Sequence, residues 1–162
     1  MGRVQKGRFT ADVSSLGDEA VVFLIGMRIN KPWRPDLWLP VFSAMPRMLA
    51  ELSQDPDSGL IGYRLTFGSG GPVVVQYWNS HEKLYAYASA PDAEHRPAWT
   101  AFNRRIRKVP GSVGIWHETY LVDRAESIYA HMAPAGLAKA TSAVPAARRG
   151  ERAKRLAHGK AA

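Results

Sequence analysis

An apolar run at residues 20–30 constrains the fold of this 162-residue chain more than any other feature. The run reads AVVFLIGMRIN, and its apolar side chains are nearly continuous rather than alternating. Continuous apolar runs of this length are typical of strands that are buried on both faces. The run is shorter than the ~20 residues that cross a membrane as a helix. It therefore predicts an internal strand in a sheet whose two faces both need cover.

Helical and strand patterns alternate through the rest of the central chain. Apolar residues at spacings of three and four predict helices, and β-branched or aromatic runs bounded by Gly and Pro predict strands. The expected elements after residues 20–30 are a helix that follows the cap residue Asp36 and has its apolar stripe over 38–52, strands 60–67 and 73–78, helices 83–90 and 95–108, and strand 113–122. This order, with its two consecutive helices counted as one, is that of a ferredoxin-like β-α-β-β-α-β domain, an α+β fold with an antiparallel sheet.

The formal net charge of +8 lies at the two ends of the chain. Residues 1–10 carry three cations and no acid, and residues 142–162 carry six cations against one acid. A nucleic-acid-binding domain carries such charge on a folded face, so basic ends make nucleic acid an unlikely partner. We expect residues 1–19 to be a partly disordered lead, residues 20–141 to be the α/β domain with a C-terminal arm, and residues 142–162 to be a basic disordered tail.

Several classes of protein are disfavoured by what the sequence lacks. It contains neither a long apolar run nor a signal-peptide pattern, so we expect no membrane segment and a cytoplasmic location. It contains no cysteine, so a metal or haem iron would need His, Tyr, Met or carboxylate ligands. It also lacks the phosphate-binding loop, the Gly-x-Ser-x-Gly elbow and the His-Glu-x-x-His motif.

Two histidines fall on faces that are expected to point inward. His95 lies four residues before Trp99, on the apolar stripe of helix 95–108. In strand 113–122, a period of two places His117 on the same face as Ile115. A histidine in such a position is either a packing residue or a functional group, and the pattern alone leaves both interpretations open.

Four sequence runs between residues 21 and 141 carry a family resemblance. They are FLIGMRINK, YWNSHEKL, HRPAW and GIWHETY. Together they resemble a bacterial family of unknown function that is grouped with the antibiotic-biosynthesis-type monooxygenases. The resemblance implies a homodimeric α/β barrel and a small hydrophobic substrate or ligand bound between sheet and helices. It leaves open whether the chain is a monooxygenase-like enzyme, a haem-dependent enzyme or a non-catalytic binding protein.

A second resemblance concerns the order of His95 and the run Trp116-His117-Glu118. This arrangement of residues is similar to that of the haem-dependent aldoxime dehydratases. In those enzymes a helix histidine ligates the haem iron, and a later strand histidine lies on the opposite side of the haem. The resemblance implies that His95, with Trp99 beside it, would hold a b-type haem. His117 would then be the distal acid/base, with Glu118 next to it. Without haem, the family resemblance implies a reaction with no cofactor.

The remaining candidates are one arginine and a set of polar and aromatic residues. Arg28 ends the first apolar strand, and it is expected either to anchor a substrate or haem propionate or to pair with Glu118. Cofactor-free oxygenases hold their substrate with a pocket amide and indoles. By that resemblance the substrate pocket would be formed by Asn30, Trp38, Trp78 and Trp116. Tryptophans at such positions are equally consistent with a core.

Overall fold

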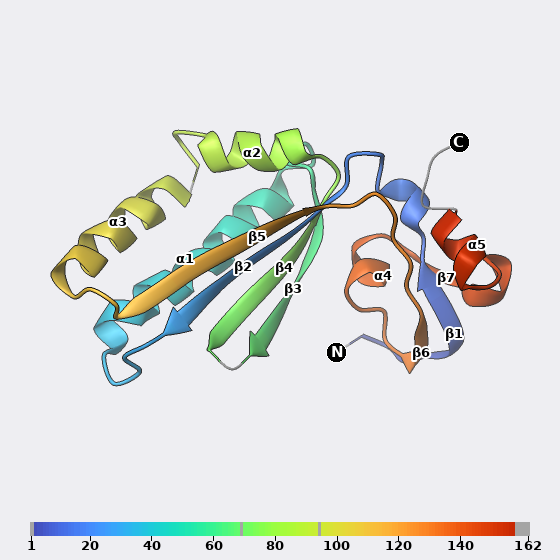
Figure 1. Cartoon of the computed structure of the whole chain (residues 1–162), viewed down its shortest axis with the longest axis horizontal. Helices are drawn as coiled ribbons and strands as arrows, with labels where there is room; N and C mark the ends of the chain where they lie inside the picture. Colours follow the sequence, from blue (N-terminus) through green and yellow to red (C-terminus); the bar gives the residue numbers. More distant parts are fainter. Residues whose placement is uncertain (1, 69, 94, 158–162) are drawn as a thin grey trace.

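A four-stranded antiparallel sheet with three helices on one face forms the larger part of the molecule (Figure 1). The computed structural model describes residues 2–68, 70–93 and 95–157. The elements of this part are β2 (Val21–Ile29), α1 (Pro35–Gln54), β3 (Leu60–Gly68), β4 (Gly71–Trp78), α2 (His81–Ser89), α3 (His95–Lys108) and β5 (Val113–Leu121). No helix in the described part of the chain combines the length and apolarity needed to cross a bilayer.

The strand order β3-β4-β2-β5 is that of the predicted ferredoxin-like fold. The apolar strand β2 lies in the interior of the sheet, where Leu24 pairs with Val75 of β4 and Glu118 of β5. α1 begins at Pro35, whose fixed φ suits the first helical position. α2 begins after Ser80, whose hydroxyl accepts a hydrogen bond from the Glu82 backbone N–H at 3.1 Å. The α+β class and the element order are therefore confirmed.

The core lies between the sheet and the helices, in two clusters. The first is centred on Trp78, which is 1% exposed and packs with Val21, Leu52 and Leu84. The indole Nε1 of Trp78 donates a hydrogen bond to Oε1 of buried Gln76 at 2.9 Å. The second cluster contains Met27, Phe102 and Val113, with Trp38, Ile106 and Ile115 packed against it. Both clusters fix the helices to the same face of the sheet.

The two ends of the chain fold together into a second, smaller sheet, which we call the terminal unit (residues 2–15 and 124–157). Its strand order is β6-β1-β7. Phe9 of β1 is 1% exposed and stacks on Tyr129 at 5.1 Å between ring centroids. Its elements are β1 (Gln5–Ala11), the 3-10 helix Val13–Ser15, β6 (Tyr129–Met132), α4 (Leu137–Ala140), β7 (Ala143–Pro145), the 3-10 helix Ala146–Arg148 and α5 (Arg152–Ala157).

The expectation that the ends are a disordered lead and a disordered tail is wrong for residues 5–11 and 143–157. Neither end carries enough apolar surface to fold alone, but together they bury Phe9 and Ala11 against α4. Salt bridges hold the C-terminal segment in place: Arg149 contacts Asp12 at 2.7 Å, and Arg155 pairs with Glu126. Residues 1 and 158–162 of the predicted lead and tail lie outside the described residues.

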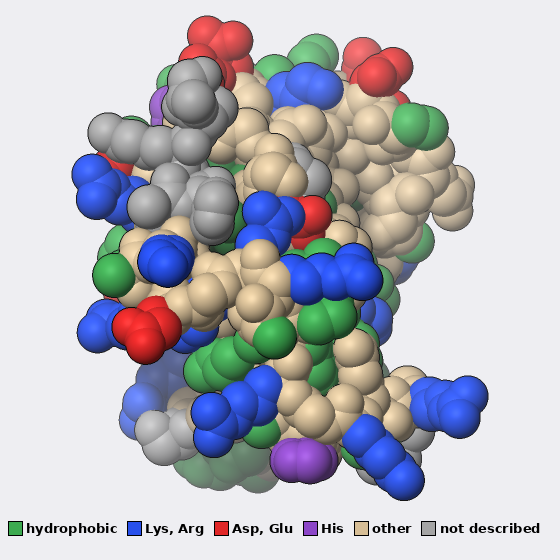
Figure 2. Space-filling view, turned by 90° about the vertical axis from the view of Figure 1, so that its right-hand side faces the viewer, with side chains coloured by type: hydrophobic (Ala, Val, Ile, Leu, Met, Phe, Trp, Pro, Cys, Tyr) green, Lys and Arg blue, Asp and Glu red, His purple; other side chains and the backbone are tan. Residues whose placement is uncertain are grey.

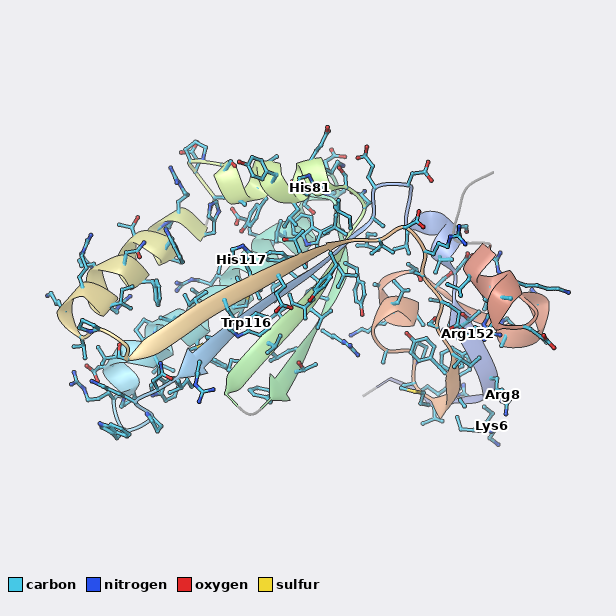
Figure 3. All side chains as sticks on the ribbon, in the orientation of Figure 1. Lys6, Arg8, His81, Trp116, His117 and Arg152 are labelled. Carbon is cyan, nitrogen blue, oxygen red and sulfur yellow. The ribbon has the colours of Figure 1, made fainter. Side chains whose placement is uncertain are left out.

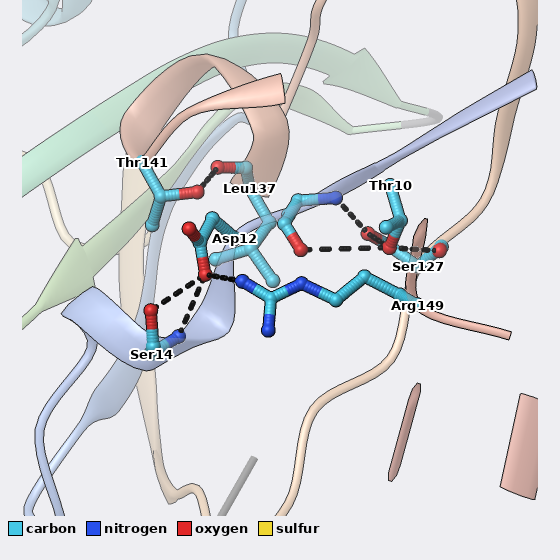
Figure 4. A network of polar contacts seen from close by, with 8 residues as sticks. Thr10, Asp12, Ser14, Ser127, Leu137, Thr141 and Arg149 are labelled. Carbon is cyan, nitrogen blue, oxygen red and sulfur yellow. Dashed lines mark hydrogen bonds and ion pairs between the residues drawn. The ribbon is translucent and has the colours of Figure 1, made fainter. Parts of the chain in front are cut away.

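Asp12 connects the two ends through one carboxylate oxygen (Figure 4). Its Oδ1 accepts hydrogen bonds from the Ser14 hydroxyl at 2.6 Å, the Ser14 N–H at 3.2 Å and Nη2 of Arg149 at 2.7 Å. The hydrogen bonds from Ser14, and then the charge of Arg149, lower the pKa of Asp12 below its usual value. A lowered folded-state pKa stabilises the fold above the unfolded-state pKa, and this stability is lost as the pH falls through the folded-state pKa.

We expect Asp12→Ala to lower the free energy of unfolding at pH 7 by about 1–2 kcal/mol, the usual cost of losing a helix cap and its hydrogen bonds. The difference from wild type should shrink at pH 2–3, because the wild-type carboxylate becomes protonated there. Urea unfolding at both pH values, with the exposed Asp18→Ala as control, measures this. A loss of equal size at both pH values would contradict the assigned electrostatic role.

Candidate functional site

His117 lies on the helix-covered face of the sheet, near the edge formed by β5. Two residues before it on the same face, Ile115 packs against Met27 and Phe102. The His117 ring lies 5.6 Å from the Phe23 ring, and the side chain is exposed. Figure 3 shows His117 on the side of β5 toward α2 and α3, and Trp116 on the other side. An exposed imidazole beside an aromatic ring is accessible to a ligand.

His95 lies at the first turn of α3, against the end of α2. Its ring is 5.3 Å from the Tyr87 ring, and both of its ring nitrogens are buried without a hydrogen-bond partner in the described part of the chain. The Tyr87 hydroxyl donates a hydrogen bond to Oε2 of Glu51 at 2.7 Å, which fixes Tyr87 in place. Buried polar atoms without partners are costly, and they are often found where a ligand or ion completes the site.

The two histidines flank one aromatic cluster. Phe23 and Tyr87 both pack against the core cluster of Trp78. His117 contacts Phe23 on one side, and His95 contacts Tyr87 on the other. The helix-covered face therefore brings His95 and His117 to the same side of the sheet. We call Phe23, Trp78, Tyr87 and the two histidines the histidine–aromatic cluster.

Glu118 and Arg28 do not join His117, because both lie on the opposite face. The Glu118 carboxylate accepts a hydrogen bond from the Tyr120 hydroxyl at 2.7 Å, and this bond raises the pKa of Tyr120. Nε of Arg28 donates to Oδ1 of Asn30 at 3.1 Å. Of the two roles expected for Arg28, pairing with Glu118 is therefore wrong. Arg28 pairs in register with Gly114, four positions along β5 from Glu118.

Trp116 lies on the same face of the sheet as Glu118 and Arg28, opposite the helices, and directly over β2. A Cβ atom added at Gly26 would lie 2.5 Å from Cε2 of the Trp116 indole. Any other residue at this position would displace the ring, so Gly26 is required for the indole to lie flat on the sheet. Trp116 is 38% exposed there, and it forms part of a surface rather than of a closed pocket.

The four residues expected to form one substrate pocket are separated in the structure. Trp78 is a core residue on the helix-covered face of the sheet, and Trp116 lies on the opposite face. Trp38 packs beside the second core cluster and donates from Nε1 to the Pro32 carbonyl at 3.1 Å. Asn30 is exposed, and its Oδ1 accepts a hydrogen bond from Nε of Arg28. Trp99, expected beside a haem, is 52% exposed and stacks on Phe102 at 5.5 Å.

Sequence reasoning did not single out Phe23, Glu51 and Tyr87. Phe23 was counted only as part of an apolar strand, and Tyr87 follows Leu84 by three residues on the buried stripe of α2. Glu51 stands beside buried Leu52 in α1, and a carboxylate at such a position needs a partner. That charge within an apolar stripe was the one signal available for this part of the cluster.

An open hollow of about 410 Å³ lies at the end of β5, beside the start of α2. Its lining includes Leu121, which shares the face of His117, together with His81 and four acidic residues, Asp18, Glu19, Glu82 and Asp123. A hollow of this size is in the range of small-molecule sites. Within the described ranges, no group of three or more His, Asp or Glu residues has the arrangement of a metal site.

The sequence model of a family described as monooxygenase af470-like matches residues 20–137. A curated relative, monooxygenase af470 of Aspergillus fumigatus, is 27% identical over 155 residues, and the match covers 83% of this chain and 54% of that protein. The chain thus spans about half the length of this relative. The family match confirms the resemblance to monooxygenases that the sequence predicts.

Two solved structures are similar in shape. A structure of aldoxime dehydratase OxdRE with butyraldoxime has a TM-score of 0.62 at 15% identity, covering 86% of this chain and 44% of that chain. SnoaB, a cofactor-independent oxygenase from Streptomyces nogalater, has a TM-score of 0.46 at 15% identity, covering 64% of this chain and 93% of that chain. At these identities a likeness extends to the fold alone.

Proposed function

Because this chain belongs to the monooxygenase af470-like family, we propose that it is an oxygenase that acts on a small hydrophobic molecule. The substrate would bind against the helix-covered face of the sheet, beside β5. The observation that carries this proposal is the histidine–aromatic cluster, in which an exposed His117 and a half-buried His95 lie on either side of Phe23 and Tyr87. Aromatic walls bind an apolar ligand, and His117 supplies the polar group for chemistry.

In the cofactor-free form of this proposal, the substrate itself reduces dioxygen. Neutral His117 accepts a proton from a C–H group that is acidified by a neighbouring carbonyl or aromatic ring. The resulting electron-rich carbon transfers electrons to dioxygen, and a C–O bond forms. In balance, one methylene group and one dioxygen molecule become one carbonyl group and one water molecule. All four electrons that reduce dioxygen come from the substrate, so no external reductant is needed.

The buried, unpartnered ring nitrogens of His95 favour a second candidate, a haem-dependent enzyme. A neutral imidazole without another partner is the kind of group that ligates haem iron, so His95 is the residue that would hold the iron. A bound haem would supply an iron centre that binds an oxygen or nitrogen atom of the substrate. His117 would then give or accept a proton there. Arg28, on the opposite face, does not fit the role of propionate anchor.

Titration of the purified chain with hemin separates these two candidates. A haem enzyme should give a sharp Soret band at one equivalent, and His95→Ala should shift or abolish that band because the iron loses its imidazole ligand. His117→Ala should retain the band, as should the control His131→Ala in the terminal unit. A broad, non-stoichiometric absorbance in wild type would exclude the haem candidate. A sharp band without turnover of any substrate would favour a non-catalytic haem-binding protein.

We also propose that the chain forms a homodimer. The face of the sheet opposite the helices, which we call the open face, has α4 over β3, where Ala140 approaches Gly62. Apolar and aromatic side chains lie on the rest of this face together with Arg28 and Glu118, and a second copy of the chain would cover the apolar ones. The apolar and aromatic ones are Val22, Leu24, Val73, Val75, Trp116 and Tyr120. A monomer in sedimentation equilibrium at micromolar concentration would contradict the homodimer.

A further inference from the structure

The positive charge of this protein is concentrated in its terminal unit. Residues 16–123 carry eleven lysines and arginines against eleven aspartates and glutamates, so the formal charge of +8 comes from the chain on either side of them. The sequence led us to expect this charge on disordered ends. Because residues 5–11 and 143–145 of those ends form strands of the sheet β6-β1-β7, the charge of the described residues is instead carried by a structured surface; Lys160 lies outside the described residues.

Apart from Arg124, which contacts Asp123 at 3.4 Å on the surface, and exposed Lys139 of α4, the cations of this unit divide into two groups. Arg149 and Arg155 are turned inward and pair with Asp12 and Glu126. The second group is exposed, and its side chains make no hydrogen bond or salt bridge within residues 2–68, 70–93 and 95–157; it consists of Arg3, Lys6, Arg8, Arg148, Arg152 and Lys154. Figure 2 shows Lys and Arg side chains spread over this side of the molecule, and Figure 3 shows Lys6, Arg8 and Arg152 on the outer side of the unit.

Two apolar side chains are exposed among these cations. Val4, between Arg3 and Lys6, is 59% exposed, and Met132 is 39% exposed. The pairing of Gln5 with Met132 brings them to the same end of the small sheet. The strand pair is irregular here, since Gly7 has φ 85° and His131 has φ 53°. This end of the small sheet therefore presents valine and methionine beside the cations of the same N-terminal segment, Arg3, Lys6 and Arg8.

We propose that this basic and apolar end of the terminal unit docks on an anionic membrane surface. Lipid phosphates and carboxylates complement the unpaired cations, and each Lys or Arg near such a surface adds about 1 kcal/mol of attraction. Val4 and Met132 gain free energy by entering the boundary between headgroups and acyl chains. A nucleic-acid backbone would use the cations in the same way, but it offers nothing to the two apolar side chains.

Vesicle cosedimentation with the full chain tests this proposal. Wild type should bind phosphatidylcholine vesicles that contain phosphatidylserine, bind weakly to pure phosphatidylcholine, and dissociate at high salt. The Lys6→Glu/Arg8→Glu/Arg152→Glu variant should lose at least about tenfold in affinity. Val4→Asp should also weaken binding severalfold, because it removes the inserted apolar group. Circular dichroism confirms that each variant is folded.

A matched control separates a local surface from overall net charge. Arg104→Glu/Arg107→Glu/Lys108→Glu makes the same change of charge at exposed positions of α3. This control should bind the vesicles as wild type does. Equal losses in both triple variants, or no dependence on phosphatidylserine, would overturn the proposal. Tighter binding to duplex DNA than to vesicles, insensitive to Val4→Asp, would replace the membrane with nucleic acid.

Discussion

His117→Ala is expected to lower the turnover of the proposed reaction by about 10²–10⁴-fold, the usual contribution of a general acid or base. The fold should be unaffected, since the side chain is exposed, its ring lies 5.6 Å from the Phe23 ring, and it makes no hydrogen bond with another described residue. The measurement is oxygen uptake in the presence of hydrophobic phenols and ketones with an acidic methylene group. The free energy of unfolding of the variant is measured in parallel.

Two further variants make the His117 result specific. Thr119→Ala changes the next side chain on the same face of β5, which is also exposed, and it should retain turnover. His117→Gln keeps a polar side chain of similar size but cannot act as a base near neutral pH, so it should be as slow as His117→Ala. Full activity in His117→Gln would show that the imidazole moves no proton and would leave it a binding role.

Trp78→Ala should cost about 3–5 kcal/mol of unfolding free energy, as expected for a large aromatic side chain in a core. Trp78 is 1% exposed and is the centre of the cluster with Val21, Leu52 and Leu84. Its removal also leaves Oε1 of Gln76, a 4% exposed residue, without its donor. Urea unfolding followed by circular dichroism measures the loss.

Trp33→Ala is the matched control for Trp78→Ala, because Trp33 is 71% exposed. Its effect on stability should lie within about 0.5 kcal/mol of zero. The comparison also tests whether Trp78 belongs to a substrate pocket, as the family resemblance implies. A Trp78→Ala protein that is as stable as wild type but has lost its ligand would show that the indole lines a pocket instead of filling the core.

The larger sheet was predictable because its elements carry their own signals. The apolar run of β2 predicts an internal strand, and the stripes of α1 and α3 predict helices that cover one face. The terminal unit was not predictable in this way. β1 is polar at its start, and its partner β6 lies more than a hundred residues away, as the pairing Phe9↔Tyr129 shows. Local patterns contain no information about such a distant partner.

The part of the candidate site that follows from local patterns was predictable, and the part that depends on distant contacts was not. The placement of His95 and His117 on the helix-covered face follows from periods of 3.6 and two, and the structure has both there. The same period of two puts Glu118 on the other face from His117, so grouping the two as neighbours in one site conflicted with the strand geometry. The pocket set of Asn30 and the tryptophans depends on tertiary packing, which no local pattern specifies.

The position of β1 between β6 and β7 has a consequence for how the chain is made. During synthesis β1 leaves the ribosome before every strand of the larger sheet, yet both of its pairing partners follow that sheet in the chain. The larger sheet can be completed once β5 has emerged, whereas β1 must wait as an unpaired strand until β6 and β7 have emerged. A shortened C-terminus that lacks β7 would leave one edge of β1 permanently open to pairing with other chains.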